Sequence, residues 1–159
     1  MAKDVSNNLV GVAGEYFVCA ELCRLGFLAM PTPKNNPLYD VVVTNAKGTK
    51  TVIFQVKTRS ITNTQGWKMG ADITNKKGNA NLFVALVELK ASGLPDIWVY
   101  KHDVLAARIA KQFAVYMATP KRDGAKRKDP GFVWHDLRSF RPYDHARKND
   151  WTAATTRLR

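Results

Sequence analysis

The stretch that most constrains the fold is residues 39–59, which is typical of a β-hairpin. Two runs rich in β-branched residues, Asp40–Val43 and Thr51–Val56, flank the segment Asn45–Gly48. Runs of this kind favour strands, and Asn and Gly favour a turn between them. The sequence therefore predicts two antiparallel strands joined by a short connection.

The predicted hairpin brings three polar side chains to one place. If Asp40 pairs with Gln55, the chain folds back between Lys47 and Gly48, where the turn-forming residues lie. Side chains alternate between faces along a strand, so Gln55 and Lys57 share a face. A register shift of one residue would move Asp40 to the opposite face. Considered singly, these residues are also compatible with a strand start, an outward polar position and a lysine that protects a sheet edge.

This constellation resembles the PD-(D/E)xK phosphodiesterase superfamily, which includes type II restriction enzymes and archaeal Holliday-junction resolvases. The family pattern is an Asp on one strand, then Glu or Gln, one residue and Lys on the next, here Asp40 and Gln55–Lys57. A preceding helix often carries a Glu, and Glu15 matches that position. The resemblance covers roughly residues 8–60. It departs from the family in having Gln55 in place of the commoner Glu, and a Pro, Pro37, that is not adjacent to the Asp.

The resemblance implies an α/β fold with a restriction-endonuclease-like core, a central mixed β-sheet flanked by helices, in a single domain spanning residues 1–159. It implies a Mg²⁺ or Mn²⁺ site, with Lys57 activating water for hydrolysis of DNA, and by analogy a homodimer. The metal ligands that it implies are Asp40, Gln55, the backbone carbonyl of Val56, and Glu15. The predicted phosphate contacts are Lys34, Thr58, Arg59, Lys121, Arg122, Lys126, Arg127 and Lys128.

The segment before the hairpin predicts a helix from Asn7 or Asn8 to about Leu25, with Gly26 as its stop. At 100° per residue, Glu15 shares a face with small and apolar residues, namely Gly11, Val18 and Leu22. Two positions remain open for Glu15. It either faces the proposed metal site or lies at the rim in solvent.

The remaining chain predicts further strands at 27–32, 82–89 and 97–100, a short edge strand at 132–134, and a terminal helix packed by Trp151. A second helix is predicted from Asp103, as its cap, to about Met117. Residues 60–81 show no clear period and are expected to form an extended loop. Within this loop, Trp67 either stacks on nucleic-acid bases or anchors the loop to the core.

Charge points to a polyanionic partner, because the net charge is +12 and the pI is about 9.9. Half of the excess lies in the basic C-terminal segment, residues 120–159, which is expected either to bind the DNA backbone or to be a solvated stretch. No apolar run is long enough to span a bilayer, so no membrane partner is expected. The two cysteines, Cys19 and Cys23, are expected to be small core residues of a reduced, cytoplasmic protein.

Three functions are compatible with these features. The first is a Mg²⁺-dependent endodeoxyribonuclease. The second is a catalytically inactive nucleic-acid-binding protein that retains the nuclease fold, which Gln55 would explain because it removes a negative charge from the site. The third is a subunit that docks to an acidic protein partner, and it depends on charge alone. The charge by itself is also compatible with a small basic protein of another kind, such as a ribosome-associated one.

Overall fold

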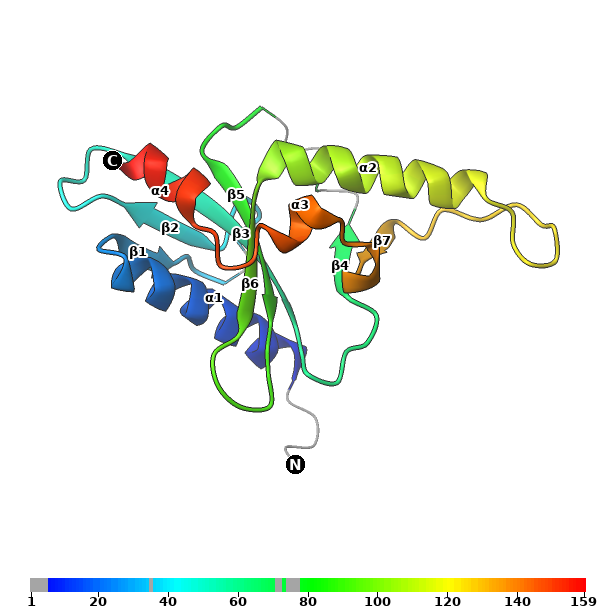
Figure 1. Cartoon of the computed structure of the whole chain (residues 1–159), viewed down its shortest axis with the longest axis horizontal. Coiled ribbons are helices and arrows are strands. Elements are labelled where there is room, and N and C mark those ends of the chain that lie inside the picture. Colours follow the sequence, from blue (N-terminus) through cyan, green and yellow to red (C-terminus); the bar gives the residue numbers. More distant parts are fainter. Residues whose placement is uncertain (1–5, 35, 71–72, 74–77) are drawn as a thin grey trace.

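The computed structural model describes residues 6–34, 36–70, 73 and 78–159. A five-stranded sheet in the order β1-β2-β3-β5-β6 forms the centre, with helices on both sides and a two-stranded ribbon, β4–β7, beside it (Figure 1). The strands are β1 Leu28–Pro31, β2 Val41–Thr44, β3 Thr51–Arg59, β4 Trp67–Gly70, β5 Leu82–Glu88, β6 Asp96–Lys101 and β7 Phe132–His135. The helices are α1 Asn7–Arg24, α2 His102–Ala118, the 3-10 helix η2 Leu137–Ser139, α3 Pro142–His145 and α4 Thr152–Leu158.

The sheet is mixed, as the sequence predicts. Strands β3 and β5 are parallel, whereas the β1–β2, β2–β3 and β5–β6 pairs are antiparallel. The β2–β3 register runs from Val41 opposite Phe54 to Thr44 opposite Thr51, which is the register predicted from the turn. Gly48 has a φ of 68°, a left-handed conformation that glycine adopts without a steric penalty. The predicted hairpin is therefore confirmed.

Each face of the sheet supports its own hydrophobic core. On what we call the α1 face, buried strand residues such as Phe54 and Phe83 pack against α1 and α4. On the opposite α2 face, Val84, Leu86 and neighbouring residues pack against α2 and the β4–β7 ribbon. Strand β5 is buried on both faces, which explains why its sequence is a continuous apolar run.

Helix α1 follows the prediction closely, with one correction at its start. Its N-cap is Ser6, whose hydroxyl accepts a hydrogen bond from the Leu9 N–H, and not Asn7 or Asn8. The helix ends at Arg24, near the predicted Gly26 stop, where φ is 90°. The expectation that both cysteines are core residues is half right, because Cys19 is buried whereas Cys23 is exposed.

The prediction of an extended loop at 60–81 is wrong in part, because β4 lies within it and pairs with β7. Trp67 is only 1% exposed, and its indole N–H donates to the Val87 carbonyl at 2.9 Å. It therefore anchors this segment to the core and is not available to stack on bases. Within this stretch, residues 71–72 and 74–77 lie outside the described residues, so the prediction is not tested there.

The C-terminal third confirms the predicted edge strand and terminal helix. Trp151 is buried and lies against Phe54, with ring centroids 5.9 Å apart. Helix α2 begins at His102 with Lys101 as N-cap, so Asp103 is not the cap; its carboxylate instead accepts from the Gly78 N–H. The segment after α2 forms a loop that projects at one end of the molecule (Figure 1). No described helix is both long and apolar enough to cross a membrane.

Candidate active site at the free edge of β3

Strand β3 extends past the start of β2, and this leaves part of its edge without a strand partner. The N–H of Ile53 and the carbonyl of Arg59 both bond toward β5, whereas the Phe54 carbonyl accepts from Asp40 on the β2 side. The N–H and C=O of one strand residue point to the same edge, and successive residues alternate. Both backbone groups of Val56 therefore point to the side on which Asp40 lies, beyond the last β2 pair.

Asp40 fills this position, directly before β2. Its backbone N–H donates to the Phe54 carbonyl and its own carbonyl accepts from Thr32, both at 2.8 Å. Its Oδ2 accepts from the Val56 N–H at 2.7 Å. Because that N–H lies in the plane of the sheet, the carboxylate is fixed at the sheet edge. Its second oxygen, Oδ1, accepts no hydrogen bond within the part of the chain that the structure describes.

Glu15 of α1 lines the same pocket as Asp40. The pocket has a volume of about 170 Å³ and lies between the first turns of α1 and the segment that joins β1 to β2. Its lining residues are Asn7, Asn8, Gly11, Val12, Glu15, Thr32, Pro33, Lys34, Asn36 and Asp40. Burial raises the pKa of Glu15, and the negative charge of Asp40 raises it further, whereas Lys34 opposes the shift. The two carboxylates therefore repel each other, an arrangement that a bound cation would relieve.

Gln55 and Lys57 lie on the other face of the sheet. Gln55 pairs with Val84 and Lys57 with Leu86, so both side chains lie on the α2 face, whereas Glu15 comes from the α1 face. Gln55 is 7% exposed, and its Oε1 is buried with no hydrogen-bond partner among the described residues. A buried, unpaired carbonyl oxygen costs about 1–3 kcal/mol, which coordination of a cation would offset.

The structure thus places the predicted site residues in two separate groups. Glu15 and Asp40 line one pocket, and Gln55 and Lys57 flank Val56, to which Asp40 is hydrogen-bonded. The pocket lined by the two carboxylates does not include Gln55 or Lys57. What links the two groups in the structure is strand β3, since Val56, which lies between Gln55 and Lys57, donates its N–H to Asp40.

The residues at this edge fit a hard divalent cation. Among the described residues no three His, Cys, Asp or Glu side chains converge, so a site made of carboxylates and imidazoles alone is absent from that part of the chain. The predicted ligands offer two carboxylates, one amide oxygen and one backbone carbonyl. An all-oxygen set with one or two carboxylates suits Mg²⁺ or Mn²⁺ and does not suit Zn²⁺.

Two of the predicted phosphate contacts are placed elsewhere. The Thr58 hydroxyl is buried beneath Gly14 of α1. Arg59 is 8% exposed, pairs with Glu88, and lies over the Trp67 ring at 4.7 Å. Strand alternation turns Arg59 to the α2 face, where the half-buried carboxylate of Glu88 and the Trp67 indole occupy its guanidinium. Neither side chain is free to hold a phosphate.

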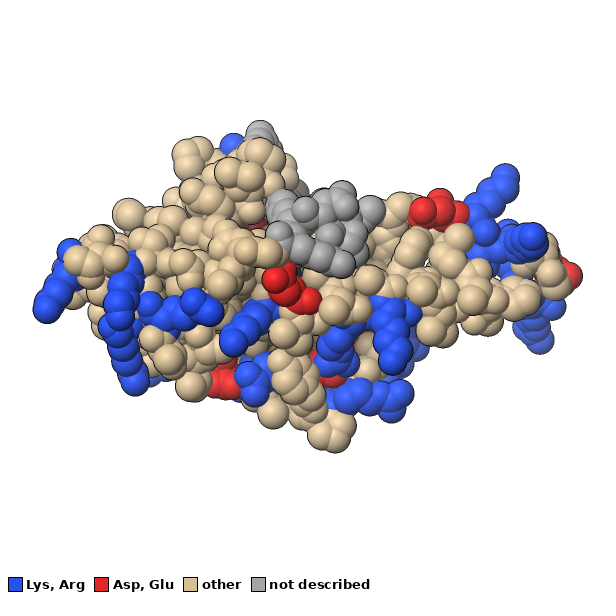
Figure 2. Space-filling view, turned by 90° about the horizontal axis from the view of Figure 1, so that it is seen from above, with Lys and Arg blue, Asp and Glu red and all other residues tan. Residues whose placement is uncertain are grey.

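The other predicted phosphate contacts are accessible. Lys34 is exposed at the pocket rim. Lys121, Arg122, Lys126 and Lys128 are exposed in the projecting loop, and Arg127 is half-buried, with its guanidinium 4.4 Å from the Tyr116 ring centroid. Figure 2 shows Lys and Arg gathered at this end of the molecule, at the opposite end, and along one side. None of the residues that line the Glu15–Asp40 pocket comes from the projecting loop.

Sequence reasoning missed the asparagines that line the pocket, Asn7, Asn8 and Asn36. It also missed the contact between Gly14 and Thr58, which sets how closely α1 approaches β3. A glycine in the middle of an otherwise regular helix was the available signal, because such a residue often marks close packing.

Comparison with known proteins supports the fold. No family model and no curated protein matches the chain. Among solved structures, the chain is similar to a bacterial homing endonuclease, I-Ssp6803I, with a TM-score of 0.52 and 14% sequence identity. The similarity covers 95% of this chain and 93% of that chain. The two proteins therefore share a fold, with a central mixed sheet flanked by helices, over nearly the whole of this chain.

Proposed function

We propose that this protein is a metal-dependent endonuclease of the PD-(D/E)xK type that hydrolyses phosphodiester bonds in DNA. The observation that carries the proposal is the position of the Asp40 carboxylate. It is held at the free edge of β3 by the N–H of Val56, the residue between Gln55 and Lys57, and it shares one pocket with Glu15. The fold shared with a homing endonuclease and the net charge of +12 support the same substrate.

In this proposal, Glu15, Asp40, Gln55 and the Val56 carbonyl would hold Mg²⁺ or Mn²⁺. When bound, the ion would supply Lewis-acid chemistry and lower the pKa of a coordinated water. The Val56 N–H keeps Oδ2 of Asp40 occupied and so reserves Oδ1 for coordination. Lys57 would orient the attacking water and stabilise the negative charge that develops on the phosphate. Lys34, at the pocket rim, would contact a phosphate beside the one that is cleaved.

The test is cleavage of a panel of labelled duplex, branched and single-stranded DNA with Mg²⁺ or Mn²⁺. We expect Asp40→Asn and Lys57→Met to reduce the rate by about 10²-fold or more. Asp123→Asn and Lys101→Met are the matched controls, because both residues are exposed and neither lines the pocket. Folded Asp40→Asn protein that cuts at the wild-type rate would show that the site is assigned wrongly.

A second candidate function is nucleic-acid binding without catalysis, and Gln55 favours it. With an amide in place of a carboxylate, the site holds two formal negative charges to bind a dication. Calorimetry with Mn²⁺ separates the candidates: the nuclease requires saturable binding that Asp40→Asn abolishes, whereas the binding protein shows none. Salt-sensitive binding to DNA without an acidic protein partner would count against the third candidate, a docking subunit. Sedimentation of the free protein tests the homodimer.

A further inference from the structure

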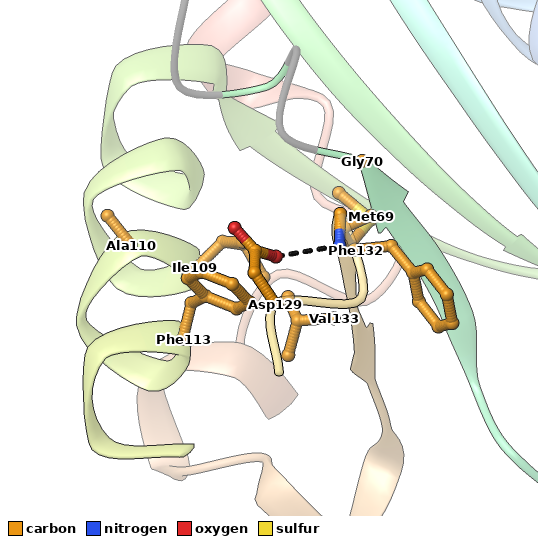
Figure 3. Close-up of a pocket in the computed structure, with 9 residues that line it drawn as sticks. Met69, Gly70, Ile109, Ala110, Phe113, Asp129, Phe132 and Val133 are labelled. Atoms are coloured by element: carbon orange, nitrogen blue, oxygen red, sulfur yellow. Dashed lines mark hydrogen bonds between the residues drawn. The ribbon is translucent and has the colours of Figure 1, made fainter. Parts of the chain in front are cut away.

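A second pocket lies away from the β3 edge, between α2 and the β4–β7 ribbon (Figure 3). Its volume is about 300 Å³, at the lower end of the range for small-ligand sites. The residues that line it are Met69, Gly70, Ile109, Ala110, Phe113, Asp129, Gly131, Phe132 and Val133. None of them lines the Glu15–Asp40 pocket, and the proposed hydrolysis does not use them.

The wall of this pocket is apolar, and it carries a single carboxylate. Ile109 and the Phe113 ring come from α2, and Met69 comes from β4. The Phe132 ring points away in Figure 3 and lies 4.3 Å from the Lys68 ammonium. Phe113 is therefore the aromatic ring that an occupant would meet.

Asp129 stands at the mouth of the pocket with one oxygen free. Its Oδ1 accepts from the Gly131 N–H at 2.7 Å, which fixes the orientation of the carboxylate. No described residue donates to Oδ2 or forms an ion pair with Asp129. The pocket thus offers an aromatic face, aliphatic walls and one oriented hydrogen-bond acceptor.

The surroundings of the pocket are strongly basic. The segment 120–131, which supplies Asp129 and Gly131, contains five Lys or Arg and two Asp. These cations would attract a polyanion and repel an isolated amine, whereas the Asp129 carboxylate would repel an anionic head group inside the pocket. A flat, neutral group that carries N–H donors and is attached to a phosphate chain satisfies both conditions, the basic surroundings and the carboxylate inside the pocket.

We propose that this pocket receives an unpaired nucleobase that bears an exocyclic amino group. The base would lie against Phe113 and donate its amino hydrogen to Asp129 Oδ2, while the basic loop holds the flanking phosphates. Carboxylates accept hydrogen bonds from the cytosine amino group, and aromatic side chains stack on bases of any type. The inference rests on the proposal that the chain acts on DNA, and it adds a preference for unpaired bases other than thymine.

A protein partner fits the pocket less well. An apolar side chain from a partner would bury the Asp129 carboxylate without supplying a donor, and an unpaired buried charge is strongly unfavourable. A nucleobase fills the same apolar space and supplies the donor. The carboxylate therefore decides between the two occupants.

The test compares binding of short deoxycytidine and thymidine homopolymers in the presence of EDTA, where no cleavage occurs. We expect wild type to prefer deoxycytidine by about fivefold or more, and Asp129→Asn to lose that preference. Asp123→Asn is the matched control, because Asp123 lies in the same loop and accepts from the Ala125 N–H in the same way, at 3.0 Å. Asp123 does not line the pocket, so its variant should keep the preference. Phe113→Leu should weaken binding of both polymers by about 5- to 150-fold.

Each alternative outcome counts against the proposal. Equal effects of Asp129→Asn and Asp123→Asn would show that loop charge alone is responsible. Wild-type affinity in Phe113→Leu would show that no base enters the pocket. A change in sedimentation mass in the Asp129 and Phe113 variants, with an unchanged ratio of polymer affinities, would assign the pocket to a second copy of the chain. If metal-dependent cleavage of duplex DNA occurs without any difference between the polymers, this inference fails while the proposed function stands.

Discussion

The contact between Gly14 in α1 and Thr58 in β3 allows a sharp test of how the helix that carries Glu15 is held. A Cβ atom at position 14 would lie 1.9 Å from Thr58 Oγ1 and 3.0 Å from both Thr58 Cβ and Cγ2. Thr58 cannot easily turn away, because a β-branched side chain is stiff at χ1. In Gly14→Ala, either the helix or the strand must therefore move.

The expected magnitude follows from two opposing effects. Overpacking costs about 1–3 kcal/mol, and Ala favours a helix over Gly by about 1 kcal/mol. Gly11→Ala is the matched control, because it lies in the same helix with nothing within 4 Å of its Cβ position. The difference in unfolding free energy between the two variants cancels the helix propensity and leaves the overpacking alone. For a chain of this length, we expect Gly14→Ala to melt about 2–12 °C below Gly11→Ala.

The assay is thermal unfolding followed by circular dichroism, with Thr58→Ala as the second arm of a double-mutant cycle. Thr58→Ala removes Oγ1 and Cγ2, so the double variant should recover much of the loss. Mn²⁺ affinity should fall in Gly14→Ala and recover with Thr58→Ala, because Glu15 moves with the helix. Equal melting temperatures for Gly14→Ala and Gly11→Ala would refute the close approach of α1 to β3.

Three further predictions concern titration and the core. Because burial and Asp40 raise the pKa of Glu15, and coordination needs its carboxylate, Mn²⁺ affinity should rise as the pH passes through that raised pKa; Glu15→Gln should abolish this rise in a calorimetric pH series. Burial lowers the pKa of His135 to about 4, so the stability that the neutral imidazole contributes is present above the unfolded pKa, about 6.5, and is lost as the pH falls toward 4. In His135→Gln, the midpoint of urea unfolding should change less with pH between 6.5 and 4 than in the wild type. Trp67→Phe should cost about 1–3 kcal/mol in chemical denaturation, because it removes the hydrogen bond from the indole N–H to the Val87 carbonyl and leaves unfilled space in the core.

The hairpin could be predicted because its determinants are local. Asn45 and Gly48 form the turn, and once the turn is fixed the pairing of Val41 with Phe54 follows from residue count alone. The burial of β5 on both faces could be predicted for a similar reason, since a continuous apolar run needs cover on both sides. These features need no knowledge of distant parts of the chain.

The positions of Thr58 and Arg59 could not be predicted, because distant segments decide them. Thr58 is buried by a glycine in α1, and Arg59 is occupied by Glu88 of β5 and by Trp67. Trp67 lies in a polar stretch whose sequence predicts a loop, and its partner strand β7 lies more than sixty residues further along. Nothing in the local sequence of Arg59 indicates what covers its face of the sheet.

The hydrogen bond from Val56 to Asp40 links the stability of the sheet edge with the chemistry proposed for it. Beyond the start of β2, the Val56 N–H has no strand partner, and an unpaired strand N–H is costly. The Asp40 carboxylate replaces that partner and in doing so is oriented with Oδ1 outward. Asn at position 40 can still present an oxygen to Val56, whereas Ala cannot. We therefore expect Asp40→Asn to melt near the wild-type temperature while losing Mn²⁺ binding, and Asp40→Ala to lose both thermal stability and Mn²⁺ binding. If Asp40→Asn lost as much stability as Asp40→Ala, the charge of Asp40, and not its hydrogen bond to Val56, would stabilise the edge.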